Sequence, residues 1–274
     1  MSSPTLPFRA IISDLDGTLL NGHHRIGDFT IETLEKLAHL GVDIFFATGR
    51  NFPDVKHIIS KVNVKEAMLV TSNGARGNNL AGELLVSRHL DENIAFDLMQ
   101  IPFDSSRVVL NSYQGDEWFI NKDIEQFKKY HQDSGFVYQV VDFSRHHGRQ
   151  TEKVFYIGKT PEDLLPIEKY IQQKYSDFVQ TTYSTPLCFE VMAKGVYKAN
   201  TLRALTQLRG YQLSDCIAFG DGMNDIEMLA QAGKGCLMQN ADPRLKAKLS
   251  DNEIIGSNQD EAVAHYIRNL FGIR

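Results

Sequence analysis

The sequence predicts an α/β fold, with a Rossmann-like, doubly wound parallel-sheet core and an inserted α+β domain. In both outer parts of the 274-residue chain, short apolar runs alternate with amphipathic segments, a pattern typical of strands and helices around a parallel sheet. In the middle of the chain, strand-like runs are joined by tight turns, which favours antiparallel pairing. These patterns together predict one α/β core that is interrupted by a second unit.

The core elements are predicted from apolar periodicity and from the residues that end each run. The segment TIETLEKLAHL, for example, places Ile31, Leu34 and Leu37 at helical spacing and stops before Gly41. The run VDIFFAT that follows is predicted to be a strand because it is short and apolar. The predicted core elements lie, in chain order, at residues 10–13, 30–40, 42–48, 51–62, 67–71, 198–208, 216–219, 224–231 and 261–270.

The middle of the chain has a different pattern. RVVLNSY and EWFIN are joined by Gln-Gly-Asp, and a charged helix (DIEQFKKYH), the strands FVYQVV and KVFYIG, and a helix opened by Pro161 follow. Strands that are joined by tight turns are expected to pair antiparallel. We therefore predict a core from residues 1–83 and 187–274, and an inserted α+β domain from residues 84–186.

Composition and charge restrict the classes of function. The chain is 42% hydrophobic and carries a formal net charge of −5 without a cluster of lysine or arginine, which argues against a nucleic-acid or anionic-membrane surface. No run approaches the roughly 20 apolar residues that span a bilayer, and residues 1–5 lack the features of a secretory signal. We expect a cytoplasmic monomer that binds neither nucleic acid nor membrane.

The stretch IISDLDGTLL places two acids, Asp14 and Asp16, directly after an apolar strand. Open α/β folds bind ligands at this carboxyl edge of the sheet. Alternation along an extended chain would turn both carboxylates to one side, where they repel unless a cation or a shared proton relieves them. Mg²⁺ suits a pair of carboxylates and a phosphate oxygen. The alternative is that Asp-Gly-Thr is only a polar turn.

Three further stretches favour a site over a turn. Thr48, Gly49 and Arg50 follow the second core strand and precede a helix, whose amino end favours anions. The stretch GDGMND at residues 220–225 follows the CIAF strand with two more acids and an amide. Lys198, near the start of a predicted helix, could bring a point charge to a phosphate, although a lone lysine there is commonly a solvated surface group.

Taken together, these residues resemble the haloacid dehalogenase superfamily of phosphotransferases. DLDGT at residues 14–18 is similar to its nucleophile motif, Thr48 to its second motif, Lys198 to its third and GDGMND to its acidic fourth. TSNGA at residues 71–75, the large insertion and CFEVMAKGVYKANTL at residues 188–202 resemble the Cof-type branch with a class IIB cap, and within it the bacterial sugar-phosphate and pyridoxal phosphate phosphatases. The Tyr-Lys-Ala sequence around the lysine departs from the usual Lys-Gly pair.

The resemblance implies a role for each matching residue. Asp14 would attack phosphorus to form an aspartyl-phosphate, and Asp16 would protonate the leaving alcohol and then activate water. Mg²⁺ would be held by the Asp14 carboxylate, the Asp16 backbone carbonyl and Asp221, with Asp225 in support. The residues implied to hold the phosphoryl oxygens are Thr48, Lys198 and Asn224, with Gly49, Arg50 and Asn73 as further candidates. Arg50 is equally compatible with pairing to a core carboxylate.

The implied function is a Mg²⁺-dependent phosphatase that hydrolyses small phosphorylated metabolites, either sugar phosphates or pyridoxal phosphate. One alternative is a phosphotransferase or mutase that uses the same aspartyl-phosphate and passes the phosphoryl group to a second hydroxyl. The other is a non-enzymatic Mg²⁺-dependent binding or receiver-like signalling module. Asp16 and the large insertion weigh against a receiver, which lacks an acid two residues after the acceptor. The sequence does not identify the metabolite.

Overall fold

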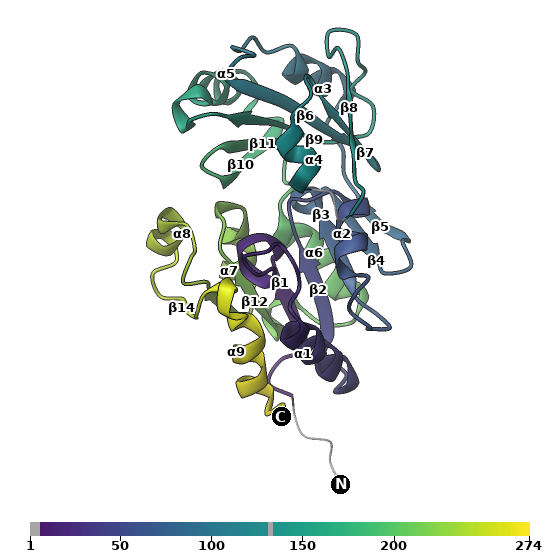
Figure 1. Cartoon of the computed structure of the whole chain (residues 1–274), viewed down its shortest axis with the longest axis vertical. Coiled ribbons are helices and arrows are strands. Elements are labelled where there is room, and N and C mark those ends of the chain that lie inside the picture. The colour runs from purple at the N-terminus through teal and green to yellow at the C-terminus, as the bar shows by residue number, and fades with distance from the viewer. Residues whose placement is uncertain (1–5, 131–133) are drawn as a thin grey trace.

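The computed structural model describes residues 6–130 and 134–274, and it has the predicted α/β architecture with two separate sheets (Figure 1). The larger sheet has eight strands in the order β14-β13-β12-β1-β2-β3-β4-β5. Its strands are β1 Ala10–Ser13, β2 Asp43–Ala47, β3 Met68–Thr71, β4 Arg76–Asn79, β5 Leu84–Ser87, β12 Cys216–Gly220, β13 Lys234–Leu237 and β14 Glu253–Ile254. Residues 1–5 and residue 131, which were part of sequence predictions, lie outside the described residues.

The centre of the larger sheet is parallel and buried on both faces. Ile11 of β1 lies opposite Ile44 of β2 and Ile217 of β12 in register, and all three side chains are almost fully buried. A parallel strand that is covered on both faces must be apolar throughout, which explains why the first strand has no alternating polar positions. The helices at both ends of the chain provide this cover.

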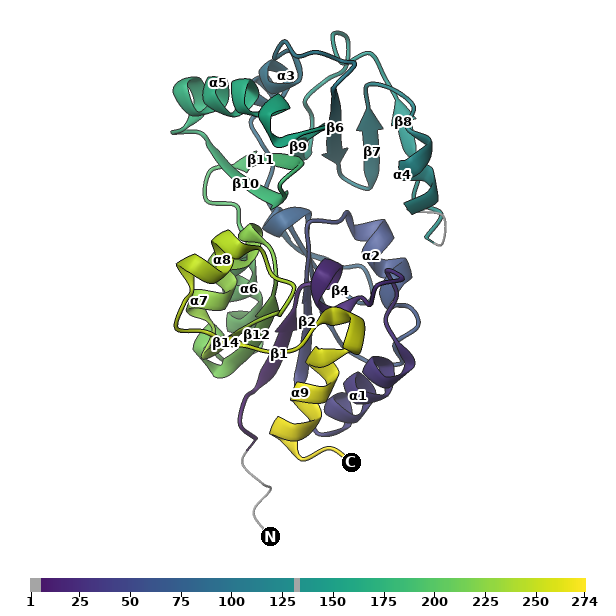
Figure 2. The same cartoon turned by 60° about the vertical axis from the view of Figure 1, so that its left-hand side comes forward.

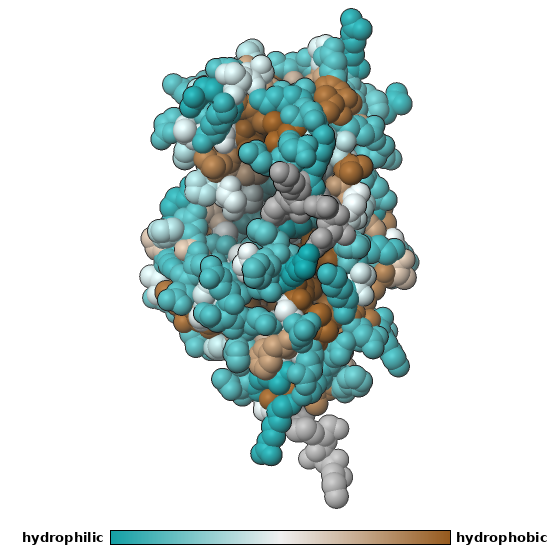
Figure 3. All heavy atoms as spheres, viewed as in Figure 1, coloured by the Kyte–Doolittle hydropathy of each residue, from teal (hydrophilic) through white to brown (hydrophobic). Residues whose placement is uncertain are grey.

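The helices of the larger sheet lie on its two faces. α1 and α9 pack together on one face, and α6 packs behind β3 and β4 on the other (Figures 1 and 2). The helices of this unit are α1 Asp28–His39, α2 Phe52–Ile59, α6 Lys198–Leu208, α7 Ile226–Gln231, α8 Pro243–Lys248 and α9 Ala262–Phe271. No helix among the described residues is long and apolar enough to cross a membrane. The face in Figure 3 is mostly hydrophilic.

One edge of the larger sheet differs from the predicted parallel arrangement. β4 pairs antiparallel with β3, and β5 pairs antiparallel with β4. The reversal occurs at residues 72–74, where Ser72, Asn73 and Gly74 all have positive φ angles of 50°, 57° and 99°. Left-handed backbone at three successive residues turns the chain back on itself. This turn also places Asn73 at the sheet edge where the site is built.

The smaller sheet has six strands in the order β10-β11-β9-β6-β7-β8. Its strands are β6 Val108–Gln114, β7 Glu117–Ile120, β8 Tyr138–Val140, β9 Thr151–Gly158, β10 Val179–Thr185 and β11 Cys188–Ala193, and its helices are α3 Glu92–Met99, α4 Glu125–Tyr130 and α5 Leu165–Tyr175. Most neighbours pair antiparallel as predicted, but β8 pairs parallel with β7. Residues 92–193, which carry this sheet and its helices, are called the inserted unit below.

The division into domains at residues 84 and 187 remains a prediction. β5 pairs in the larger sheet although its residues fall within the predicted insertion, and β11 pairs in the smaller sheet although its residues fall within the predicted core. Each sheet has its own apolar core, and the two large clusters share no residue within the described part of the chain. Separate cores are the property that lets two units of one chain shift relative to each other.

Candidate active site

The carboxyl ends of the central strands lie at the edge of the larger sheet that faces the inserted unit (Figure 2). Asp14 follows β1, Thr48 follows β2 and Asp221 follows β12. These strands are parallel neighbours, so their ends meet at one edge. The polar motifs that lie far apart in the sequence are thereby brought together.

Three carboxylates converge at this edge. Oxygen atoms of Asp14, Asp221 and Asp225 all lie within 4.8 Å of one another. Lys198 Nζ donates hydrogen bonds to Asp14 Oδ1 at 2.6 Å and to Asp225 Oδ1 at 2.7 Å. Lys198 is only 1% exposed, and Asp225 is fully buried. The ammonium group is thus held between two carboxylates away from solvent, where ion pairs are little screened.

Negative charge exceeds positive charge in this cluster, because three carboxylates face one ammonium. Burial raises the pKa of Asp14 well above its usual value; Lys198 opposes the rise, and Asp225 and Asp221 add to it. Burial also raises the pKa of Asp221 to about 7, with Asp225 as the next contributor. Burial lowers the pKa of Lys198, but attraction to Asp14 and Asp225 outweighs it and the net shift is upward. A divalent cation would restore the balance.

The loop after β1 holds Asp221 in place. Residues Leu15–Leu19 form a loop in which Asp16 is extended, with φ −73° and ψ 123°, and Gly17 is left-handed, with a φ of 76°. Thr18 Oγ1 donates a hydrogen bond of 2.7 Å to Asp221 Oδ1, and Asn240 Nδ2 donates to the carbonyl oxygen of Gly17 at 2.7 Å. A Cβ atom on Gly17 would overlap Asp221 Oδ2. Only glycine fits this approach between the two loops.

The loop after β12 closes on the Asp225 side chain. Asp225 Oδ2 accepts hydrogen bonds from the backbone N–H groups of Asp221 and Gly222 at 3.0 and 2.9 Å. A Cβ atom on Gly220 would lie 2.7 Å from Asp225 Cγ, which explains the glycine before the first acid. Asp225 therefore shapes the loop with one oxygen and binds Lys198 with the other.

The Asp16 carboxylate does not join the cluster but pairs with Arg50. Arg50 Nε and Nη2 each donate a hydrogen bond of 2.6 Å to one oxygen of Asp16, and Nη1 donates to Asp54 Oδ2 at 2.7 Å. The alternation argument fails here because β1 ends at Ser13, and Asp16 lies in the loop that follows, directly before the left-handed Gly17. Of the two uses foreseen for Arg50, the structure has the pairing with carboxylates.

The remaining predicted residues form a second hydrogen-bonded group beside the cluster. Thr48 Oγ1 accepts from the N–H of Arg50 at 3.1 Å, and the carbonyl oxygen of Thr48 accepts from the N–H of Asn73 at 3.0 Å. Asn224 Nδ2 donates to Asn73 Oδ1 at 3.0 Å. A Cβ atom on Gly49 would lie 3.0 Å from that same Asn73 oxygen. Three loops of the larger sheet are therefore in direct contact.

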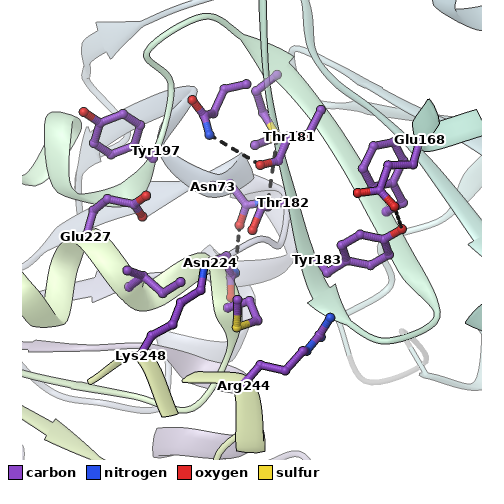
Figure 4. A pocket seen from close by; sticks show the side chains of 15 residues that line it. Asn73, Glu168, Thr181, Thr182, Tyr183, Tyr197, Asn224, Glu227, Arg244 and Lys248 are labelled. Carbon is purple, nitrogen blue, oxygen red and sulfur yellow. Dashed lines mark hydrogen bonds between the residues drawn. The ribbon is translucent and has the colours of Figure 1, made fainter. Parts of the chain in front are cut away.

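A pocket of about 340 Å³ lies between β10 of the inserted unit and the loops of the larger sheet (Figure 4). Asn73 and Asn224 line it from the larger unit, together with Arg244 and Lys248 of α8, while Tyr183 of β10 lines it from the inserted unit. A wider hollow of about 550 Å³ reaches Asp221 beside the turn between β10 and β11. A small molecule could therefore lie between the two units.

Several residues at this edge were not singled out from the sequence. Thr18 belongs to the DLDGT motif, and its hydroxyl donates a hydrogen bond to Asp221 that the sequence alone does not indicate. Glu190 and Lys153 of the inserted unit contact Asn73 and Gly49. Each is a charged residue within an apolar strand, CFEVMA or TEKVFYIG. A charge at a buried strand position is the signal that could have identified both of them.

Comparison with known proteins identifies the family. The family model of haloacid dehalogenase-like hydrolases matches residues 11–267. The chain belongs to the haloacid dehalogenase-like hydrolase family. The cluster of Asp14, Asp221 and Asp225 with Lys198 is thus the candidate active site of a haloacid dehalogenase-like hydrolase, and the resemblance inferred from the motifs is confirmed.

Individual relatives extend this result for the hydrolase. A protein of Haemophilus influenzae named "Putative phosphatase" is 54% identical over 268 residues, covering 98% of each chain. The HMP-PP phosphatase of an Enterobacter species is 35% identical, covering 93% of this chain and 92% of its own. The predicted enzyme class, a phosphatase, is supported by these relatives and by the family.

Solved structures share the fold. A haloacid dehalogenase-like hydrolase of B. subtilis superposes with a TM-score of 0.84 at 22% identity, covering 96% of this chain and 99% of its own. A sugar phosphatase of subclass IIB superposes with a TM-score of 0.80 at 23% identity, covering 97% and 100%. The predicted α/β architecture is confirmed for this hydrolase.

Proposed function

We propose that this hydrolase is a Mg²⁺-dependent phosphatase that releases phosphate from small phosphorylated metabolites through an aspartyl-phosphate on Asp14. Sugar phosphates and pyridoxal phosphate are the proposed substrates. The observation that carries the proposal is the buried cluster of Asp14, Asp221 and Asp225 with Lys198 between two of them. The names of the relatives, which include a sugar phosphatase, agree with a small leaving group.

Mg²⁺ fits the donors of this cluster. Mg²⁺ prefers oxygen ligands and binds through one or two carboxylates together with substrate phosphate oxygens, and the carboxylates of the cluster outnumber its ammonium group. Asp14 and Asp221 would bind it through carboxylate oxygens and Asp16 through its backbone carbonyl, with Asp225 in support. When bound, Mg²⁺ would neutralise the phosphoryl oxygens and orient them for transfer.

The residues of the chain carry out the transfer itself. An Asp14 oxygen would form a bond to phosphorus as the bond from phosphorus to the leaving oxygen breaks, and Asp16 would give that oxygen a proton. Asp16 would then take a proton from the water that cleaves the aspartyl-phosphate. The hydrogen bond from Lys198 restricts rotation of the Asp14 carboxylate. Thr48, Lys198 and Asn224 would hold the phosphoryl oxygens.

The inserted unit would bind the leaving group. The pocket beside Asn73 and Asn224 has the size of a small-ligand site, and one wall of it is β10 of the inserted unit. Enclosure between two units would exclude water from the phosphoester. The choice of metabolite would then depend on the residues of β10 and of α8.

A phosphate-release screen with Mg²⁺ tests the proposal. The panel contains sugar phosphates, pyridoxal phosphate, HMP-PP and nucleotides, because one relative is named for HMP-PP. We expect phosphate release from sugar phosphates or from pyridoxal phosphate. Transfer of the phosphoryl group to a second hydroxyl without release of phosphate would instead identify a phosphotransferase or mutase. No reaction with any member of the panel would contradict both.

Replacing Asp221 by Ala is expected to weaken Mg²⁺ binding and activity together, because the change removes one of the carboxylates that would bind the ion. Mg²⁺ affinity is measured by calorimetry and activity by phosphate release at increasing Mg²⁺. Asp242→Ala is the matched control for Mg²⁺ affinity only: Asp242 lines the same hollow without joining the carboxylate cluster, but it pairs with Arg244, which lines the proposed substrate pocket. Full turnover of the wild-type protein in excess chelator would exclude a required metal.

Replacing Gly17 by Ala is expected to lower kcat/KM on the order of 10²-fold, because the new Cβ atom displaces the Asp221 carboxylate. Gly41→Ala is the matched control, since Gly41 also has a positive φ, of 80°, but a Cβ atom there meets no described atom within 4 Å. Both variants carry a backbone cost of about 1–2 kcal/mol, measured by thermal unfolding. Equal activity in the two variants would show that the contact with Asp221 is unimportant.

A further inference from the structure

A buried ion pair of the inserted unit lies at the interface with the larger sheet. Lys153 of β9 and Glu190 of β11 form a salt bridge between Nζ and Oε1. The two residues are 3% and 2% exposed, and their strands are antiparallel neighbours. Two charges that have lost their water require further hydrogen bonds to offset desolvation. The other partners of this pair therefore indicate what it is for.

Both members of the pair also bind the larger unit. Lys153 Nζ donates a hydrogen bond of 2.7 Å to the carbonyl oxygen of Gly49. Glu190 Oε2 accepts a hydrogen bond of 2.7 Å from Asn73 Nδ2. Asn73 is 1% exposed, and the other acceptor near this nitrogen is the Met192 sulfur at 3.9 Å, which is a weak acceptor. These two hydrogen bonds from the pair thus end on two loops that carry predicted phosphoryl-binding residues.

The contact with Asn73 extends to a third loop. Asn73 Oδ1 accepts a hydrogen bond from Asn224 Nδ2 at 3.0 Å. A carboxylate only accepts hydrogen bonds, so Glu190 fixes the Asn73 amide with its nitrogen toward the inserted unit and its oxygen toward Asn224. That oxygen in turn sets the orientation of the Asn224 amide. Glu190 therefore acts on Asn224 through Asn73.

We propose that Glu190, together with Lys153, is a positioning residue of the active site. With the inserted unit seated, the pair aligns the loop of Gly49 and the loop of Asn73, and through Asn73 the side chain of Asn224. Binding of the phosphoryl group is thereby coupled to seating of the inserted unit, in addition to any choice of leaving group. The inference rests on the proposed phosphatase function.

Inorganic phosphate is the probe that separates positioning from leaving-group recognition, because it has no leaving group. A residue that only contacts the leaving group leaves the inhibition constant of phosphate unchanged. A residue that aligns the phosphoryl loops changes it. Replacing a residue that only stabilises the fold lowers the unfolding temperature but changes neither the inhibition constant of phosphate nor kcat/KM.

The first variant is Glu190→Gln, which keeps the shape of the side chain. Glutamine has one acceptor oxygen in place of two, so either Asn73 or Lys153 loses its hydrogen bond to residue 190. We expect the inhibition constant of inorganic phosphate to rise about tenfold to a hundredfold, the size expected for the loss of one charge-assisted hydrogen bond. We expect kcat/KM to fall on the order of 10²-fold, because the phosphoryl loops are misplaced.

Lys153→Met tests the hydrogen bond from Lys153 to Gly49, and it is also expected to raise the inhibition constant of phosphate. Removing one member of a buried pair leaves an unpaired charge, which can prevent folding. The double variant Lys153→Met with Glu190→Gln removes both charges and decides the matter where a single variant does not fold. Asp116→Asn is the control for losing an ion pair across the same interface: Asp116 pairs with Arg76, and among the described residues neither side chain forms a hydrogen bond with Gly49, Asn73 or Asn224.

The proposal is overturned if inorganic phosphate inhibits the folded variants of the pair with the same inhibition constant as the wild-type protein. It is also overturned if Asp116→Asn raises that constant as much as the variants of the pair do. Failure of the proposed function gives a different result, since the wild-type protein would then release no phosphate from the substrate panel. The binding of inorganic phosphate is also measured by calorimetry with Mg²⁺ present, so that the comparison does not depend on turnover.

Discussion

Replacing Asp14 by Asn is expected to lower kcat by on the order of 10⁴-fold or more while the protein remains folded. An amide oxygen is too weak a nucleophile to form the acyl phosphate. The fold should survive because the new asparagine side chain keeps an oxygen that can accept the hydrogen bond from Lys198, and Lys198 retains its bond to Asp225. Phosphate release and the unfolding temperature are measured on the same preparation.

Trapping of the phosphoenzyme decides whether Asp14 is the nucleophile. Wild-type protein that is mixed with a labelled activated ester and quenched in acid should carry label, and the Asp14→Asn protein should carry none. Binding of inorganic phosphate to the variant shows that its site keeps its shape. Label on the Asp14→Asn protein would assign the nucleophile to another carboxylate.

Much of the larger sheet could be predicted because its strands are buried on both faces. Strands of this kind are continuous apolar runs, and the predicted run 10–13 corresponds to β1. The helix predicted over 198–208 has the same bounds as α6, since Leu202 and Leu205 mark its buried face. The carboxyl ends of such strands give the location of the candidate site without any knowledge of side-chain contacts.

Other features could not be predicted because they depend on contacts across long sequence distances. β4 consists of Arg-Gly-Asn-Asn, and this polar run gives no sign of a strand. It pairs with β3 only because the turn at residues 72–74 brings it back. The contact of Glu190 with Asn73 joins residues that are 117 positions apart. Periodicity reports which face of an element is buried, but it does not identify the partner.

The two acids of the opening motif are a case in which local reasoning fails in an informative way. Alternation predicts that Asp14 and Asp16 face one side, but Asp16 follows the end of β1 and lies in a turn with Gly17 at positive φ. The Asp14 carboxylate meets Lys198, whereas the Asp16 carboxylate meets Arg50. Different partners for neighbouring acids are the usual means by which a site gives them different roles.

Replacing Asp16 by Asn is expected to lower the rate with a sugar phosphate on the order of 10²- to 10⁴-fold. The reason is that an alkoxide is a poor leaving group and needs a proton, which the amide cannot supply. A phosphorylated phenol whose phenolate leaves readily should lose less, because its departure needs little acid catalysis. The ratio of the two rates is measured under single-turnover conditions, so that cleavage of the aspartyl-phosphate does not limit both.

Arg50→Lys is the matched variant for this prediction. Lysine keeps the positive charge but cannot make the two parallel hydrogen bonds that hold the Asp16 carboxylate. If Arg50 acts by orienting Asp16, Arg50→Lys should also slow the sugar phosphate more than the phosphorylated phenol, but by a smaller factor than Asp16→Asn. The double variant with Asp16→Asn should then be little slower than Asp16→Asn alone. A rate loss in Arg50→Lys that is equal for both esters would mean that Arg50 acts on the phosphoryl group itself.

In the steady state, Asp16→Asn should also accumulate labelled phosphoenzyme from the activated ester, because the water that cleaves the aspartyl-phosphate has lost its base. Absence of that label would exclude Asp16 from the second step.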